Sequence, residues 1–391
     1  MRTGDDGHDA EIVVAASLAQ RPGHGGHAWA ILQWVLGLRS LGRRVLLVDR
    51  LEPEMCVDAD GRRCPPERSV NLRYLRAVAR RFGLDGDWAV LCDGGRRAIG
   101  LTREHLLRRV SAAAGMLDVM GFMTDGRLLE RVRRRVFVDI DPGYGQIWCA
   151  SGLDHPLDGH DAHVTIGERI GRPDCAIPTC GIDWVTSPQP VALEHWTPAP
   201  AGRAYTGVAS WRGPYGTTTH RGVTYGSRVH EFRNFLRLPR LRPGRYELAL
   251  DIHPAEERDI AALRDNGWSL VDPRAACGDP DAYRDFIRAS RAEFMVAQQI
   301  YVGTRSGWFS DRSICYLASG KPVLAQETGF TDRYPAGRGL LAFSTVEEAA
   351  AGIDAIEADH ATHAAAAREI AEEYFDARKV LPRVLERVGL G

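Results

Sequence analysis

Two histidines flank a pair of glycines in the stretch RPGHGGHAW, which covers residues 21–29. The stretch lies between a predicted strand and a predicted helix. Gly25 and Gly26 allow the backbone to pass close to a ligand, and the free N–H groups at the start of a helix attract an anion. His24 and His27 titrate near neutral pH, so either can act as a general base here. A histidine in such a place can equally well cap a tight turn.

A second group of polar residues marks the start of a predicted helix in the C-terminal half of the chain. Ser310 is a good N-cap, Asp311 suits the first turn, and Gly320 ends the helix before the apolar strand at residues 322–325. Arg312 adds a fork of hydrogen-bond donors that suits a diphosphate. This segment therefore predicts an anion-binding helix start.

Two more arginines, Arg305 and Arg212, stand where they can reach the same helix start. Arg305 precedes the helix, and Arg212 directly follows the predicted strand Tyr205–Trp211. In an open parallel sheet, helix starts and the loops after strands lie on one edge, where ligands bind. We therefore expect Arg305, Arg212 and Arg312 to converge on one anion, with scattered surface charge as the alternative.

Acidic residues follow two predicted strands of the N-terminal half. Asp93 lies in the stretch LCDGG, and Asp139 and Asp141 lie in FVDIDPGYGQIW. Aspartates at strand ends often initiate turns, and they can also bind acceptor hydroxyls or orient a histidine base. No third ligand accompanies Asp139 and Asp141, so the spacing does not predict a metal site.

The composition narrows the class of protein. A chain of 391 residues suggests two domains, and a net charge of −1 gives no footprint for nucleic acid or an anionic membrane. The eight cysteines form no C-x-x-C pair, and the segment Met1–Glu11 is polar and acidic, unlike a signal peptide. We expect a cytoplasmic protein with reduced thiols, no nucleic-acid partner and no integral membrane contact.

Strands alternate with helices along the chain, which is typical of parallel sheets built from βαβ units. The alternation predicts two Rossmann-like domains whose ligand edges face each other across a cleft. The expected divisions are an N-terminal domain at 1–185, a Pro-rich linker at 186–202, a second domain at 203–375 and a returning helix at 376–391. The C-terminal part reads as helical, with Pro382 as its one interruption.

This plan and two short motifs resemble the glycosyltransferases of the GT-B fold, particularly the group-1 superfamily. The motifs are the glycine pair entering the first helix and the segment SDRSICYLASGKPVL, in which Arg312 stands eight residues before Gly320. The likeness covers nearly all of the chain in plan, but only 22–27 and 306–330 in motif. Cys315 and Gly307 depart from the family, because glutamates usually occupy these two positions.

The resemblance implies a metal-independent hexosyltransferase-like enzyme without a cofactor. It would move a sugar from a nucleotide diphosphate sugar to a small-molecule acceptor, as in natural-product biosynthesis. The implied donor-binding residues are Arg212, Arg305, Ser310, Asp311, Arg312, Glu327 and Gly329. The implied catalytic residues are His27, His24 and Asp141, and the implied acceptor-binding residues are Gly25, Gly26, Asp93 and Asp139.

Three other functions remain open from the sequence. A nucleotide-sugar epimerase on the same fold would need no acceptor. A non-catalytic nucleotide-sugar binding protein is suggested by the missing glutamates. A dehydrogenase is disfavoured, because the first loop lacks the G-x-G-x-x-G spacing of a dinucleotide site.

Overall fold

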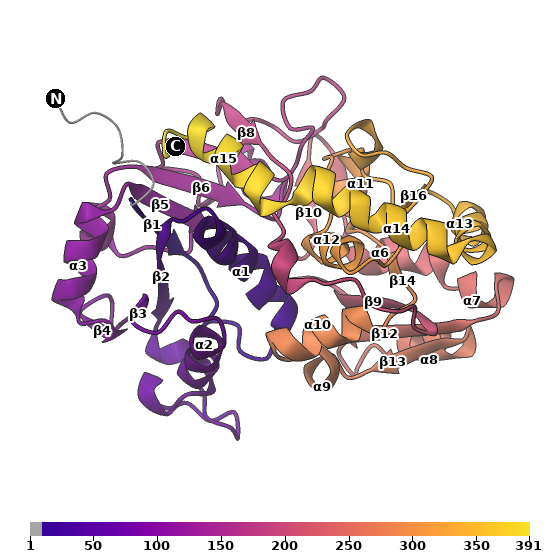
Figure 1. Ribbon diagram of the computed structural model, residues 1–391, viewed down its shortest axis with the longest axis horizontal. Helices are drawn as coiled ribbons and strands as arrows, with labels where there is room; N and C mark the ends of the chain where they lie inside the picture. Colours follow the sequence, from indigo (N-terminus) through magenta and orange to yellow (C-terminus); the bar gives the residue numbers. More distant parts are fainter. Residues whose placement is uncertain (1–9) are drawn as a thin grey trace.

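The computed structural model describes residues 10–391, which form two α/β domains side by side (Figure 1). The N-terminal domain contains an eight-stranded sheet of order β4-β3-β2-β1-β5-β6-β7-β8, parallel except where β4 pairs with β3. Its strands are β1 (Glu11–Ala15), β2 (Arg44–Leu51), β3 (Trp88–Cys92), β4 (Arg97–Gly100), β5 (Gly115–Val119), β6 (Arg135–Asp139), β7 (Ala162–Thr165) and β8 (Trp184–Thr186).

Within the described residues, five α-helices connect most of the strands of this domain. They are α1 (Gly25–Ser40), α2 (Val70–Arg81), α3 (Arg103–Ala112), α4 (Gly126–Leu129) and α5 (Tyr144–Ala150). Ser69 caps α2, accepting a hydrogen bond from the N–H of Leu72 at 3.1 Å. Helix α1 is buried on almost every side, because its apolar residues meet both the sheet and the C-terminal helices.

The C-terminal domain contains a six-stranded parallel sheet of order β13-β12-β9-β14-β15-β16. Its strands are β9 (Ala204–Ser210), β12 (Arg245–Asp251), β13 (Trp268–Val271), β14 (Ala292–Met295), β15 (Val323–Gln326) and β16 (Leu340–Phe343). Its helices are α6 (Arg228–Phe232), α7 (Leu238–Leu241), α8 (Glu257–Asp265), α9 (Pro273–Cys277), α10 (Pro280–Arg288), α11 (Gln299–Gly303) and α12 (Asp311–Ala318). The predicted fold class, two Rossmann-like domains, is confirmed.

The C-terminal helices cross back to the first domain, as predicted. Helices α13 (Val346–Ala358) and α14 (His360–Ile370) lie on the second domain, and α15 (Ala377–Arg387) packs on α1. Figure 1 shows this run in yellow, spanning both domains. The prediction that Pro382 interrupts the helical run is wrong, because Pro382 lies inside α15; a π-helical turn at Ala371–Phe375 instead separates α14 from α15.

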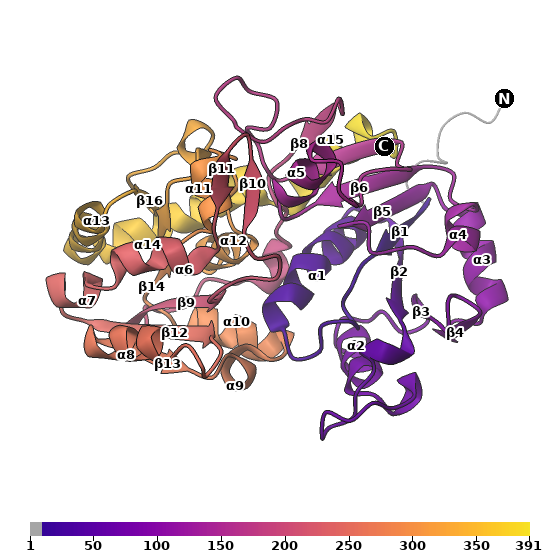
Figure 2. The same cartoon turned by 180° about the vertical axis from the view of Figure 1, so that it is seen from behind.

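Several elements were absent from the sequence prediction, among them β4, β8, β16 and the two described next. An antiparallel hairpin of β10 (Thr218–His220) and β11 (Val223–Tyr225) follows β9 and lies against α5 of the first domain, as Figure 2 shows from behind. Helix α5 itself was also missed, because its glycine-rich start after Asp141 reads as a loop. The ring of Tyr215, from the segment before β10, lies 4.7 Å from the ring of Tyr144.

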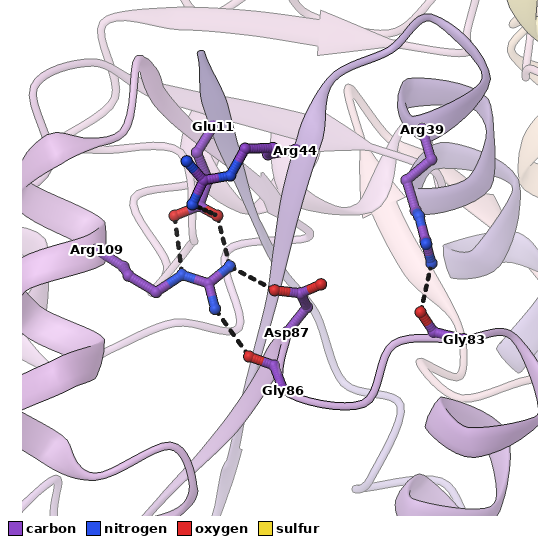
Figure 3. A network of polar contacts seen from close by, with 7 residues as sticks. All are labelled: Glu11, Arg39, Arg44, Gly83, Gly86, Asp87 and Arg109. Carbon is purple, nitrogen blue, oxygen red and sulfur yellow. Dashed lines mark hydrogen bonds and ion pairs between the residues drawn. The ribbon is translucent and has the colours of Figure 1, made fainter. Parts of the chain in front are cut away.

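An ion-pair network fastens the amino edge of the first sheet (Figure 3). Arg109 of α3 donates from Nε to Glu11 Oε2 at 3.0 Å and from Nη2 to Asp87 Oδ1 at 2.7 Å. Its Nη1 donates to the carbonyl oxygen of Gly86 at 2.8 Å. One guanidinium therefore ties α3 to the start of β1 and to the turn before β3.

No helix in residues 10–391 combines the length and the apolar character needed to cross a membrane. The segment Met1–Glu11, which we read as unlike a signal peptide, lies almost entirely outside the described residues.

Candidate functional site

A cavity of about 390 Å³ lies between the two domains. The first domain contributes the loop after β1, the start of α1 and the loop after β6. The second domain contributes the loops after β9, β12 and β13 and the start of α12. The lining residues are Arg21, Gly23, His24, Gly25, Gly26, His27, Ala30, Ile140, Asp141, Val208, Ala209, Ser210, Gly213, Pro214, Asp251, Pro273, Arg274, Cys277, Tyr283, Trp308, Asp311 and Arg312.

The glycine pair at the start of α1 allows the two domains to touch. A Cβ on Gly25 would lie 2.2 Å from the carbonyl oxygen of Asp279, and a Cβ on Gly26 would lie 2.9 Å from the ring of Tyr283. Gly25 and Gly26 do line the cavity, but the geometry explains them by this close approach of α10 rather than by the predicted acceptor contact.

A second contact holds the same pair of elements together. Arg81, at the end of α2, forms a two-pronged ion pair with Asp281 of α10, with distances of 2.7 and 3.0 Å. The indole N–H of Trp29 donates to the carbonyl oxygen of Pro280 at 2.8 Å. The described conformation is therefore a closed one, in which α1 and α10 fix the distance between the walls of the cavity.

The two histidines predicted at this edge both line the cavity, but in different settings. His27 Nε2 lies 3.2 Å from the carbonyl oxygen of Ser17 and 3.1 Å from the hydroxyl oxygen of the same residue. In the tautomer whose Nε2–H donates a hydrogen bond to that carbonyl oxygen, Nδ1 keeps the lone pair. Burial, together with the charge of Arg21, lowers the pKa of His27 to about 4. His24 is exposed, and its Nδ1 lies 3.2 Å from the carbonyl oxygen of Pro22. His27 is therefore neutral at physiological pH.

Asp141 lies in the cavity wall, whereas Asp139 does not. Burial raises the pKa of Asp141 to about 7, even though Tyr301 donates a hydrogen bond to it at 2.6 Å. Asp139 accepts hydrogen bonds from Gln146 at 2.6 Å and from Thr165 at 2.8 Å, so its side chain is committed to holding α5 on the sheet. The acceptor role predicted for Asp139 therefore needs correction, since its carboxylate is engaged by Gln146 and Thr165 and does not line the cavity.

The start of α12 forms the opposite wall. Ser310 is fully buried and caps the helix, accepting the N–H of Arg312 at 3.2 Å. The Nε of Arg312 donates to Glu293 Oε1 at 2.6 Å, and Glu293 on β14 has 0% of its side chain exposed. Glu293 thus fixes the orientation of the guanidinium, whose other N–H groups remain available at the cavity. Asp311 is the neighbouring lining residue, and burial raises its pKa.

The sequence did not reveal a second buried guanidinium, Arg228 at the start of α6. Its Nη1 donates to the carbonyl oxygen of Ser210, a cavity-lining residue, at 2.7 Å, and its Nε donates to Val296 at 2.9 Å. Burial and the charge of Arg312 lower the pKa of Arg228 to about 10. Among residues 10–391, no carboxylate forms an ion pair with Arg228. The site therefore holds a buried positive charge without a direct ion-pair partner among the described residues, and Asp141 is the acid whose charge acts on it.

Arg212 and Arg305, the two other predicted donor-binding arginines, do not line the cavity. Arg212 is exposed and pairs with Glu256, its Nη2 lying 3.0 Å from Oε2. Arg305 is also exposed, and its Nε lies 3.7 Å from Asp174 Oδ2. The expectation that they converge with Arg312 is not met, because both point to the surface, where acids neutralise them.

Glu327 and Gly329 lie outside the cavity as well. Glu327 accepts the N–H of Gly329 within its own loop. A Cβ on Gly329 would lie 2.4 Å from the side chain of Arg169, which passes from the first domain to an ion pair with Asp332. Gly329 is therefore explained by this passage between the domains. We no longer assign either residue to a sugar.

Asp93 lies away from the cavity, where it pairs with Arg97 at 2.9 Å. Within residues 10–391, no three His, Cys, Asp or Glu side chains are grouped so as to hold a metal ion.

No family model matches this chain, and no curated protein matches its sequence. Solved structures match 97% of the chain. HepE from Anabaena, in complex with UDP-glucose, matches with 11% identity over 99% of its own chain and a TM-score of 0.60. An alpha-glucosyltransferase bound to UDP and a 13-mer DNA matches with 10% identity over 100% of its chain and a TM-score of 0.61. AviGT4, a glycosyltransferase involved in Avilamycin A biosynthesis, matches with 12% identity over 97% of its chain and a TM-score of 0.54. These matches show that the chain has the GT-B fold.

Proposed function

We propose that the protein is a glycosyltransferase that moves a sugar from a nucleotide diphosphate sugar to a small-molecule acceptor. The observation that carries this proposal is the buried Arg312 at the start of α12, in a cavity whose other wall holds His27 and Asp141. A helix start and a guanidinium suit a diphosphate leaving group, and a base across the cavity suits an attacking hydroxyl. UDP and UDP-glucose bound in structures of the same fold support this choice of donor.

In the proposed reaction, the acceptor oxygen attacks the anomeric carbon as the bond from that carbon to the diphosphate breaks. The acceptor proton passes to Asp141, whose pKa of about 7 matches that of a base working near neutrality. His27, with its pKa of about 4, is a weaker base, and we assign its Nδ1 to hydrogen bonding of substrate. Arg312, with Arg228 behind it, stabilises the charge that develops on the diphosphate, so the transfer is proposed to need no metal.

The test is a donor screen followed by product analysis. A ligand that binds only the folded protein raises its melting temperature. Thermal-shift measurements with UDP and other nucleoside diphosphates, with and without an attached sugar, therefore identify the nucleobase of the donor. The preferred nucleotide sugar is then incubated with and without hydroxylated acceptors, including small aglycones typical of natural products. Transfer to an acceptor supports the proposal. A changed sugar without any acceptor indicates an epimerase, and binding without turnover under either condition indicates a binding protein.

A further inference from the structure

We propose that a second pocket, on the N-terminal domain alone, binds the phosphate group of a small phosphorylated molecule. This arginine pocket has a volume of about 520 Å³ and is formed by the loops after β2, β3 and β5 together with the starts of α3 and α4. It shares no lining residue with the interdomain cavity. Both lie at the carboxyl edge of the first sheet, because β1, whose following loop carries His24, stands between β2 and β5. The inference does not depend on the proposed sugar transfer.

Four arginines line the arginine pocket: Arg50, Arg96, Arg103 and Arg127. The Nε of Arg50 is buried and, within the described chain, has no hydrogen-bond partner. Arg103 donates from Nε to the carbonyl oxygen of Gly95 at 2.6 Å, and its terminal N–H groups form no hydrogen bond with any residue in the range 10–391. Arg96 and Arg127 are exposed, and neither forms an ion pair with another residue in the range 10–391.

The acids that share this pocket are largely engaged by the backbone. Glu52 Oε2 accepts the N–H of Gly94 at 3.1 Å, and its Oε1 lies 3.8 Å from Arg50 Nη1. Asp125 caps α4, accepting the N–H of Leu128 at 2.7 Å. Glu130 stands exposed at the rim. The guanidinium groups therefore present more donors than the acids can accept, and an anion is the group that would satisfy them.

The glycines of the stretch LCDGG line the arginine pocket and not the interdomain cavity. Gly95 has a φ of +74°, which favours glycine, and a Cβ on it would lie 1.5 Å from Asp125 Oδ2, so a larger residue here would have to displace the side chain of Asp125. The loop that carries Arg96 therefore lies against the start of α4, and Arg96, Arg103 and Arg127 line the same pocket. Guanidinium forks that approach from separate loops suit a tetrahedral phosphate, whose oxygens point in several directions.

Exposed arginines alone would not distinguish this pocket from the rest of an arginine-rich surface. Helix α2 provides the comparison, because Arg73 and Arg76 line a second arginine-rich hollow, of about 310 Å³, together with Arg68 and Arg80. Arg73 and Arg76 are exposed and have no ion-pair partner in the described part of the chain, and none of the described residues that line this hollow has a buried polar atom without a hydrogen-bond partner. Replacing Arg73 and Arg76 removes the same charge as replacing Arg96 and Arg127. Comparing the two double variants therefore distinguishes a specific phosphate site from general electrostatic attraction to an arginine-rich surface.

The experiment measures the binding of glucose 6-phosphate by isothermal titration calorimetry, with glucose as the uncharged comparison and with or without saturating UDP. We expect the wild-type protein to bind glucose 6-phosphate but not glucose, with the same affinity when UDP is present. R96S/R127S should weaken this binding at least tenfold, and R73S/R76S should leave it unchanged. Because both double variants change only exposed side chains, their melting temperatures should match that of the wild type.

Three results would overturn the proposal. Equal affinity of the wild type and R96S/R127S would remove these arginines from any phosphate site. Competition by UDP would place the phosphate in the interdomain cavity instead. Equal weakening in both double variants would show non-specific attraction. None of these measurements depends on turnover, so they test phosphate binding by the arginine pocket separately from the proposed transferase activity.

Discussion

Because Arg312 pairs with Glu293, substituting Arg312 alone would change both nucleotide binding and the stability of the fold. Arg312→Ala removes a proposed diphosphate contact, but it also leaves the Glu293 carboxylate, which is 0% exposed, without its 2.6 Å partner. Breaking a buried ion pair by removing one member costs about 3–5 kcal/mol of unfolding free energy. A loss of nucleotide binding in this variant alone would therefore be ambiguous.

Replacing both members resolves the ambiguity. Arg312→Leu with Glu293→Leu leaves no unpaired charge, and such replacements of buried pairs are often neutral or stabilising by about 1–4 kcal/mol. We expect the double variant to regain most of the stability lost in Arg312→Ala, as measured by urea unfolding. It should still bind UDP more weakly by about 2–3 kcal/mol, which is roughly a 30- to 150-fold rise in Kd by calorimetry. Arg291→Ala, which breaks the Arg291–Glu357 ion pair of the same domain, is the control and should not change UDP affinity. Wild-type affinity in the double variant would refute the assignment of Arg312 to the diphosphate.

Four further outcomes are expected. If Asp141 is the base, kcat/KM should fall as the pH drops below about 7; if His27 is the base, kcat/KM should fall only near pH 4. Asp141→Asn should lower kcat by ~10²–10⁴-fold and abolish the fall in kcat/KM near pH 7. The raised pKa of Asp141, 3.8 to about 7, means that its contribution to stability is complete below pH 4 and lost as pH rises through 7, so Asp141→Asn should make urea unfolding less sensitive to pH in that window. Gly25→Ala should push the domains apart, because the new Cβ would lie 2.2 Å from the carbonyl oxygen of Asp279. X-ray scattering should then give a larger radius of gyration, and kcat should fall. An unchanged radius of gyration would show that the contact relaxes without domain movement. Arg109→Leu should lower the unfolding free energy by about 3 kcal/mol, because it leaves Glu11, which is only 7% exposed, without this ion-pair partner. The affinity for UDP should not change. An unfolding free energy equal to that of the wild type would show that Arg44 suffices as the partner of Glu11.

The elements around the cavity could be predicted because local signals and tertiary structure agree there. Ser310 caps α12 as its residue type suggests, and Gly320 follows the end of that helix with a φ of +66°. The glycine pair was predicted to lie in the loop before the first helix, but α1 begins at Gly25 and includes both glycines. The reason for the pair could not be read from the sequence, because the atoms that Gly25 must avoid belong to Asp279, more than 250 residues away.

The choice among arginines failed for a different physical reason. Sequence position placed Arg212 and Arg305 beside the correct edge, but their side chains find acids at the surface. Arg228 occupies the start of a short helix without any recognisable motif, and only its burial and its contact with Ser210 connect it to the site. Which arginine serves an anion depends on burial and on the absence of a neutralising acid, and both are tertiary properties.

The division of the proposed chemistry follows from the way the two sheets meet. The groups suited to a leaving diphosphate, Arg312 and Arg228, belong to the second domain, and the base, Asp141, belongs to the first. Neither wall holds all the groups of the proposed reaction, so we expect its rate to depend on the separation of the walls. That separation is set by backbone contact of Gly25 with the α10 start, a contact between atoms that cannot adapt as a side chain can. We expect contact of α1 with α10 to align the reacting atoms of the proposed transfer across the cavity and to reduce the access of water to the donor.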